Sequence, residues 1–325
     1  FPVRRRDTAA FDRVNRKLMQ GQRLSLQEEQ TFVEEMVNSP QLYEYMLDSS
    51  DDYSLYVFIP YMFGTTYFGM QICPEKSVLI PCFHDEAYLY LRLFRQAYIQ
   101  ARGMIYNAMP EMELAGRVYD FSSTEQICMG IGMDTDLHPD AEAFRKAYHI
   151  EKPFLLYAGR KDTGKNVHTL LRYFAEFKRR QPSDLQLVLI GGGQIEIPVS
   201  VQDDVYDLGF VTAQDKYNAM AAAELLCQPS HNESFSLVIM ESWLCGRPVL
   251  VHAKCAVTRD FARRSNGGLY FKDYFEFEGC VQYLLSHPEA AKTMGENGGQ
   301  FVRENFDWDV IVEKYKTFFQ KLTEE

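Results

Sequence analysis

Two glutamates separated by seven residues stand in the part of this sequence that is richest in chemical groups. Glu233 and Glu241 belong to the run HNESFSLVIME at 231–241, which follows an apolar, strand-like segment. We therefore expect the chain to pass from a strand end through a polar loop into a helix. A helix start exposes unpaired amides and about half a positive charge, which favours phosphate. Glu233 would then face a ligand from the loop, and Glu241 would reach another part of the ligand from about two turns inside the helix.

Each glutamate taken singly has a simpler explanation. Glu233 is then a carboxylate near a helix N-terminus, and Glu241 is a solvated residue on the same helix. A functional interpretation therefore needs a second segment that points to the same ligand.

The run YAGRKDTGKN at 157–166 is that second segment, again with the pattern of strand, loop and helix start. Gly159 lets the backbone approach a ligand, Arg160 suits bidentate phosphate binding, and Lys165 supplies a point charge. The spacing approaches a P-loop, but Asn166 stands where a hydroxyl should hold magnesium, and we find no strand ending in the required Asp. By itself the segment is equally consistent with a solvated turn.

The glycine run at 190–193 resembles a dinucleotide-binding loop. Glu196 occupies the sixth position of that fingerprint, where glycine or alanine is required, so the sequence argues against an NAD site. No D-x-D triplet suits a metal-assisted transferase either, and no cofactor or metal is expected.

Composition narrows the class of protein. The chain has 325 residues, 46% hydrophobic content and a net charge of −11, which indicate two globular domains and argue against nucleic-acid binding. Its seven cysteines include no C-x-x-C pair, which is typical of a reducing cytosol. The longest apolar run, Leu55 to Phe63, is too short to cross a bilayer. We expect a cytoplasmic protein, with Arg4–Arg6 and Lys178–Arg180 available for peripheral contact with the inner face of the membrane.

The second half of the chain alternates apolar runs with amphipathic stretches, the pattern of a doubly wound parallel α/β sheet. Thr212 and Asp215 have the spacing of a helix capping box. The expected strands are Phe154–Ala158, Leu185–Ile190, Val205–Leu208, Leu225–Gln228, Pro248–His252 and Leu269–Phe271.

The first half is predicted to be a second α/β domain that lacks its first strands. Its opening 50 residues read as helices only, with a capping box at Ser25 and Glu28. Strands are expected at Leu55–Ile59, Val78–Pro81, Met104–Tyr106 and Ile127–Gly130, and a last helix at Val310–Leu322.

Together these segments resemble the retaining glycosyltransferases of family four, which have the GT-B architecture of two facing Rossmann-like domains. The resemblance covers 151–306 best. It rests on Glu233 and Glu241 of the E-x7-E motif, the tail Cys245-Gly246-Arg247-Pro248-Val249, the loop from Ala158 to Lys165, and Asp207-Leu208-Gly209-Phe210-Val211.

The resemblance implies a role for each matching residue in binding a UDP- or GDP-linked sugar. Arg160 and Lys165, with Gly159, would hold the diphosphate, and Glu241 the ribose. Glu233 would contact the transferred sugar, while Phe210 and Val211 would lie near the base. The amides of Phe235, Ser236 and Leu237 would cap phosphate or sugar oxygens, beside Ser234. Ser234 and Ser236 stand where the family commonly has glycine.

The resemblance also implies a domain plan and an activity. Residues 1–150 would form a partial acceptor-side domain, 151–306 the donor-binding domain, and 307–325 a C-terminal helix able to pack back on the first domain. His84, in the strand-end segment PCFHDE, resembles the family's acceptor-domain histidine and would act in catalysis. The implied reaction transfers a sugar to a glycan or lipid-linked acceptor with retention and without metal. A sugar-nucleotide-binding module without turnover, or another GT-B enzyme such as a phosphorylase, remains an alternative.

Overall fold

The computed structural model of the protein describes residues 1–324. Contacts between residues divide the chain into two compact units, each described by itself below. Unit 1 comprises Phe1–Gly130 together with the described residues from Val312 on, and unit 2 comprises Ile131–Ile311. The predicted boundaries at 150 and 306 stay predictions.

Unit 1 begins with three helices, as the sequence predicts: α1 (Thr8–Met19), α2 (Leu26–Glu34) and α3 (Pro40–Asp48). The predicted capping box at α2 is confirmed. The Glu28 amide donates to Ser25 Oγ at 3.2 Å, and the Ser25 amide donates to the Glu28 carboxylate at 2.7 Å. Two otherwise unpaired amides at the helix start are thereby satisfied.

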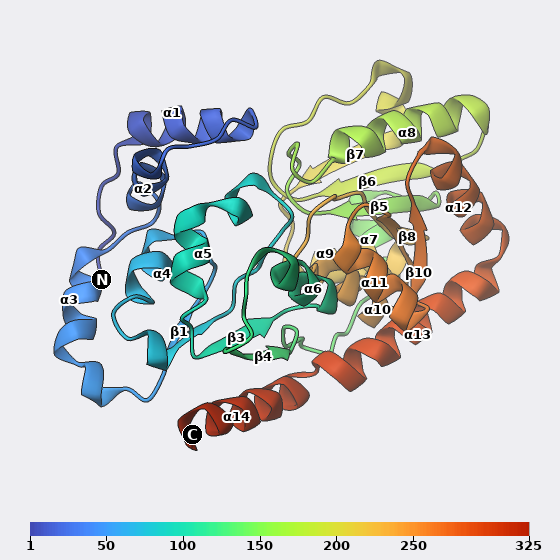
Figure 1. Cartoon of the computed structure of the whole chain (residues 1–325). Helices are drawn as coiled ribbons and strands as arrows, with labels where there is room; N and C mark the ends of the chain where they lie inside the picture. Colours follow the sequence, from blue (N-terminus) through green and yellow to red (C-terminus); the bar gives the residue numbers. More distant parts are fainter. Residues whose placement is uncertain (325) are drawn as a thin grey trace. The chain divides into compact units, whose positions relative to one another are not determined.

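The sheet of unit 1 has four parallel strands in the order β1-β2-β3-β4 (Figure 1). Val78 pairs with Val57 on one side and with Gly103 on the other. All four predicted strands are confirmed, with ends that differ from the predicted ones by at most two residues. The strands are β1 (Tyr56–Phe58), β2 (Ser77–Leu79), β3 (Gly103–Tyr106) and β4 (Glu125–Cys128), and the other helices of the unit are α4 (Gly64–Gly69), α5 (Arg92–Tyr98) and α6 (Met109–Val118).

The last helix, α14 (Trp308–Glu324), begins in unit 2, and its residues from Val312 on belong to unit 1. Phe318 and Leu322 pack against Gly103 of β3. A Cβ on Gly103 would lie 2.9 Å from Leu322 Cδ1, so the helix approaches β3 closely at this glycine.

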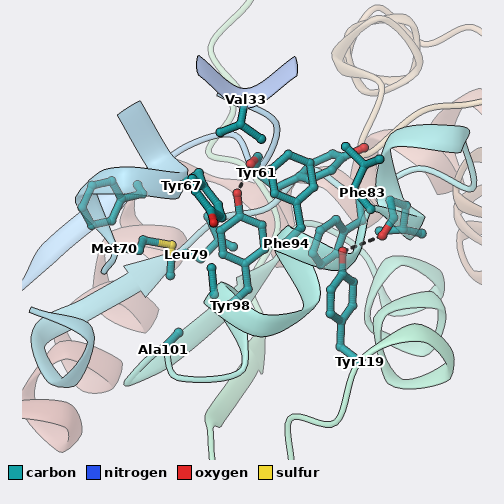
Figure 2. Packing of buried hydrophobic residues seen from close by; sticks show 14 of the residues in the cluster. Val33, Tyr61, Tyr67, Met70, Leu79, Phe83, Phe94, Tyr98, Ala101 and Tyr119 are labelled. Atoms are coloured by element: carbon teal, nitrogen blue, oxygen red, sulfur yellow. Dashed lines mark hydrogen bonds between the residues drawn. The ribbon is translucent and has the colours of Figure 1, made fainter. Parts of the chain in front are cut away.

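The core of unit 1 is rich in aromatic rings, and Figure 2 shows Tyr61, Phe83, Phe94 and Tyr119 gathered together. The ring centres of Tyr61 and Phe83 lie 4.9 Å apart, and those of Phe83 and Tyr119 lie 5.3 Å apart. The buried hydroxyl of Tyr119 donates to the Leu89 carbonyl at 2.7 Å, so its polar end is satisfied. The cluster fixes the segment that follows β2, which carries His84.

Unit 2 contains a six-stranded, wholly parallel sheet in the order β10-β9-β8-β5-β6-β7 (Figure 1). Every residue of β5 and β6 is buried, because central parallel strands are covered on both faces. Leu155 pairs with Leu187 on one side and with Leu225 on the other. The strands are β5 (Phe154–Ala158), β6 (Gln186–Ile190), β7 (Val205–Gly209), β8 (Leu225–Gln228), β9 (Val249–His252) and β10 (Gly268–Phe271).

An α-helix follows each strand of unit 2 except β6, after which the chain forms a short 3-10 helix at Val199–Asp204, and the predicted doubly wound α/β class is confirmed for this half. Thr212 caps α9 and accepts a hydrogen bond from the Asp215 amide at 3.0 Å, which is one half of the predicted capping box. In the other half the Asp215 carboxylate accepts from the Thr212 hydroxyl at 2.9 Å and not from the Thr212 amide. None of the helices within residues 1–324 is long and apolar enough to cross a membrane. The helices of this unit are α7 (Ala141–Tyr148), α8 (Val167–Arg180), α9 (Ala213–Ala222), α10 (Leu237–Leu244), α11 (Ala256–Ser265), α12 (Tyr274–Ser286) and α13 (Pro288–Phe306).

Candidate functional site

The strand order of unit 2 creates a switch point between β5 and β8. After β5 the chain places β6 along one edge of that strand, and later it returns to place β8 along the other edge. In open α/β sheets, ligands bind where loops diverge at the carboxyl ends of such strands. The two loops at this point are 159–166 and 229–236, which are the two segments that the sequence singles out.

Lys165 and Glu233 meet at the switch point. Lys165 Nζ lies 2.7 Å from Glu233 Oε1, and the two side chains are 25% and 10% exposed. The Lys165 amide donates to Asp162 Oδ1 at 2.9 Å, which holds the turn that presents the lysine. The two predicted segments therefore bring a cation and a carboxylate together at one place, still partly open to solvent.

The start of the first loop packs against the glycine run at 190–193. A Cβ on Gly191 would lie 2.1 Å from the Gly159 carbonyl oxygen, so glycine is required there. The Lys161 amide donates to the Gly192 carbonyl at 2.7 Å, and its buried ammonium forms an ion pair with Asp207. The glycines therefore allow the two loops to pack closely together. Their resemblance to a dinucleotide-binding loop did not predict this contact.

Arg160 and Phe210 project from this edge of the sheet. The Arg160 side chain is 76% exposed, and its Nη1 lies 3.5 Å from Asp162 Oδ2. Phe210 is 86% exposed, and its ring covers Gly192, where a Cβ would lie 2.5 Å from Phe210 Cζ. Val211 follows it and is half-buried. Both Arg160 and the Phe210 ring are therefore largely exposed to solvent.

The second loop is anchored by Phe235 and ends at Ser236. Phe235 is fully buried, with its ring centre 5.3 Å from that of Phe261 and 5.0 Å from that of Phe306. Ser236 has φ 79°, in the left-handed region, and its buried hydroxyl has no partner within the described chain. Leu237, half exposed, is the first residue of α10.

The position expected for Glu241 is wrong by about one turn. Because the left-handed Ser236 delays the helix start to Leu237, Glu241 is the fifth residue of α10. It is also 8% exposed, which rules out the solvated alternative. Its Oε1 accepts from Lys216 Nζ at 2.5 Å, while Oε2 is buried without a partner among residues 1–324.

Lys216 is a residue that the sequence analysis missed. It lies in the first turn of α9, and its ammonium also sits 4.9 Å from the centre of the Tyr217 ring. Thr212, which was predicted to cap this helix, marks its start. Nothing in the local sequence connects Lys216 with α10. The pairing arises because α9 and α10 pack against each other.

His84 lies in unit 1, five positions after the end of β2, and its side chain is 26% exposed. Its Nδ1 lies 3.5 Å from Glu86 Oε1, the same oxygen to which the buried Tyr61 hydroxyl donates at 3.0 Å. Glu86 thus links the histidine to the aromatic core. Among the described residues, no group of three or more His, Cys, Asp or Glu side chains could hold a metal ion.

A buried carboxylate, Glu111, holds the His84 segment in place. It accepts from the Phe83 amide and from the Asn107 amide, both at 2.7 Å. Burial raises the pKa of Glu111 to about 7, although both hydrogen bonds act in the opposite direction. The loop after β2 is therefore tied to the loop after β3 through one carboxyl group that was not predicted as a site residue.

Comparison with known proteins identifies relatives of unit 2. Residues 140–301 match the sequence profile described as "Glycosyl transferases group 1". D-inositol 3-phosphate glycosyltransferase from Saccharomonospora viridis is 32% identical over 174 residues, which are 48% of this chain and 40% of that protein. Trehalose synthase from Pyrococcus horikoshii is 27% identical over 187 residues, 53% and 45% of the two chains. The chain thus spans less than half the length of these curated relatives.

Solved structures are similar over most of the chain. Sucrose-phosphate synthase from Thermosynechococcus elongatus superposes with a TM-score of 0.71 at 20% identity, covering 93% of this chain and 80% of that one. HepE from Anabaena, solved in complex with UDP, gives a TM-score of 0.70 at 17% identity, covering 86% and 82%. This likeness confirms the predicted GT-B fold, with a parallel α/β sheet in each unit.

Proposed function

This chain belongs, through residues 140–301, to the glycosyl transferases group 1 family, and from that premise we propose its function. It transfers a hexose from a nucleotide-sugar to a glycan or lipid-linked acceptor, with retention at the anomeric carbon and without metal. The observation that carries the proposal is the pair of partly exposed lysine–glutamate contacts, Lys165–Glu233 and Lys216–Glu241, in unit 2.

The donor occupies the switch point between β5 and β8. The diphosphate is bound by Arg160, Lys165 and the start of α10, because together they supply positive charge without a metal ion. Glu241 holds the ribose, kept in place by Lys216. Glu233 contacts the transferred sugar. Such preorganised charge is often the largest contribution to catalysis.

The remaining donor contacts come from backbone amides and from an aromatic ring. The amides of Phe235, Ser236 and Leu237, beside Ser234, cap phosphate or sugar oxygens. Phe210 and Val211 lie near the base, and the exposed Phe210 ring is suited to stack on it.

In the transfer step, the bond from the anomeric carbon to the phosphate oxygen breaks, and its electron pair stays on the phosphate. The acceptor hydroxyl attacks the same face of the sugar and gives its proton to that phosphate oxygen. Positive charge builds on the sugar ring in the transition state, where the Glu233 carboxylate stabilises it. Lys165 stabilises the negative charge of the departing diphosphate.

The base and the acceptor are assigned by chemical class only. The HepE structures contain UDP and UDP-glucose, and we expect a UDP- or GDP-linked hexose here. His84 of unit 1 is proposed to contact the transferred sugar or the acceptor. Arg4, Lys178, Arg179 and Arg180, which were expected to be available for peripheral membrane contact, each form an ion pair with a carboxylate of this chain.

A thermal-shift panel of UDP-, GDP- and ADP-sugars in the presence of a chelator tests donor binding. A donor at a hundred times its Kd should add about 2.7 kcal/mol of stability. Stabilisation by none of them would remove the proposal. A donor that binds but is never transferred to any acceptor would favour the alternative, a sugar-nucleotide-binding module without turnover.

A further inference from the structure

Asn166 joins the two loops of the switch point. Its backbone is left-handed, with φ 57°, at the residue that precedes α8. Its side-chain amide reaches the other loop, where Nδ2 lies 3.0 Å from the Pro229 carbonyl oxygen and 3.1 Å from His231 Nε2. The residue next to Lys165 thus contacts the loop that carries Glu233.

These two contacts determine the state of His231. The amide nitrogen of Asn166 has two hydrogens and only donates, so one goes to the Pro229 carbonyl and the other to His231 Nε2. Nε2 must therefore accept, which requires a neutral imidazole with its proton on Nδ1. The reversed amide would place its oxygen against the Pro229 carbonyl, pairing two acceptors.

The surroundings of His231 keep the ring neutral. Burial and the nearby Lys254 ammonium lower the pKa of His231. His252 lies against it, with ring centres 4.3 Å apart, and accepts from the Lys254 amide at Nδ1, at 3.1 Å. Burial, His231 and Lys254 lower the pKa of His252 to about 4. Across the same loops, Glu233 is engaged by Lys165.

We infer that Asn166 and His231 are positioning residues, which clasp loop 159–166 to loop 229–236 and so hold Lys165 against Glu233 in the geometry that receives the donor diphosphate. The inference rests on the proposed function. It adds to that function two residues that would act on the donor site without touching the donor. Protonation of His231 would put an N–H on Nε2, facing the N–H of Asn166, and the clasp would be lost. Donor affinity should therefore fall in acid because His231 becomes protonated, and not because the donor changes its charge.

The variants separate a positioning role from a merely structural one. Asn166→Ala removes both donated bonds, and His231→Leu removes the acceptor. His231→Gln keeps an acceptor near the position of Nε2 but does not titrate in this range. His168→Gln, at an exposed histidine on α8, is the matched control.

The measurement is calorimetric binding of the UDP- or GDP-hexose that stabilises the wild-type chain, at pH 7.5 and 5.5, with Tm recorded in parallel. A sugar nucleotide is chosen because its diphosphate diester does not ionise in this range. At pH 7.5 His231→Leu should weaken binding about tenfold, the equivalent of one lost hydrogen bond, and Asn166→Ala, which loses two, should weaken it at least as much. His231→Gln should bind like wild type at pH 7.5 and lose the acid-induced weakening, while His168→Gln keeps it.

Wild-type affinity in both Asn166→Ala and His231→Leu would overturn the inference and leave the proposed function standing. The inference would also be overturned if His231→Gln bound as poorly as His231→Leu, with an equally lowered Tm, because the histidine would then be structural. Failure of the wild type to bind any donor would overturn both.

Discussion

The ammonium of Lys165 lies 2.7 Å from the carboxylate of Glu233, although the two residues are 68 positions apart in the chain. Each side chain is mostly buried and supplies the counter-charge that the other needs. In the proposed function the two groups have different roles, since the lysine faces the diphosphate and the glutamate faces the sugar.

Loss of the lysine should weaken binding of the nucleotide. Lys165→Ala removes a charged contact and leaves Glu233 to repel the phosphates, so nucleoside diphosphate affinity should fall by about 1.5 to 3 kcal/mol. Arg160→Ala should cost less than Lys165→Ala, because Arg160 is largely exposed. Calorimetry in the presence of a chelator measures both. Lys292→Ala, an exposed cation on α13, is the control, and unchanged affinity in both test variants would remove the phosphate-loop assignment.

The two glutamates should differ in their kinetic effects. Glu241→Gln should raise KM with a smaller effect on kcat, because the ribose changes little between ground and transition states. Glu233→Gln should lower kcat by about 10², on the order of 3 kcal/mol, because charge develops beside it. Steady-state transfer assays separate the two parameters. Normal kcat in Glu233→Gln would contradict the E-x7-E interpretation even though the fold is right.

Ser236, with its left-handed backbone, should stabilise the protein less than glycine would at the same position. Ser236→Gly should raise the free energy of unfolding by about 1 kcal/mol and Tm by about 2–4 °C, because glycine adopts φ 79° without strain. The variant also removes a buried hydroxyl that has no partner within the described chain. Ser234→Gly is the matched control. Ser234 has no positive φ, so glycine there should stabilise nothing, and a lower Tm in Ser236→Gly would show that the hydroxyl is satisfied.

Glu111 should make stability fall as the pH rises. Its pKa is raised from 4.5 to about 7 on folding, so its favourable contribution is complete below pH 4.5 and is lost as the pH rises through 7. The loss amounts to about 3 kcal/mol. His252, whose pKa is lowered to about 4, acts in the opposite direction in acid.

The contribution of Glu111 is therefore measured as a difference between two profiles. The unfolding free energies of wild type and Glu111→Gln, followed from pH 4.5 to 8, contain the same contribution from His252, which cancels on subtraction. Parallel profiles would show that Glu111 ionises normally despite its burial.

His84 is expected to affect transfer and not nucleotide binding. His84→Ala should lower the transfer rate while nucleoside diphosphate affinity stays nearly intact, because the donor contacts all lie in unit 2. The paired measurement is transfer rate and calorimetric affinity on one preparation. An equal loss of both, with a lowered Tm, would identify a structural histidine held by Glu86.

The sequence by itself determined the elements. Strands such as β5, β8 and β9 were predicted because a strand buried in a parallel sheet is an almost continuous apolar run, and such runs are visible locally. The capping residues Ser25 and Thr212 were predicted for the same reason, since a cap involves residues only three positions apart. The two loops that carry Lys165 and Glu233 were found because a loop between a strand and a helix has a recognisable local pattern.

Tertiary structure decided how these parts meet. No local pattern indicates that Lys216 of α9 pairs with Glu241 of α10, or that Asn166 reaches His231, because these contacts depend on which strands become neighbours in the sheet. The left-handed conformation of Ser236 is likewise not a preference of serine, and α10 begins only after it, so Glu241 lies about one turn nearer the helix start than the sequence predicts. Local propensities act over a few residues, whereas ion pairs and packing join residues that only the folded chain brings together.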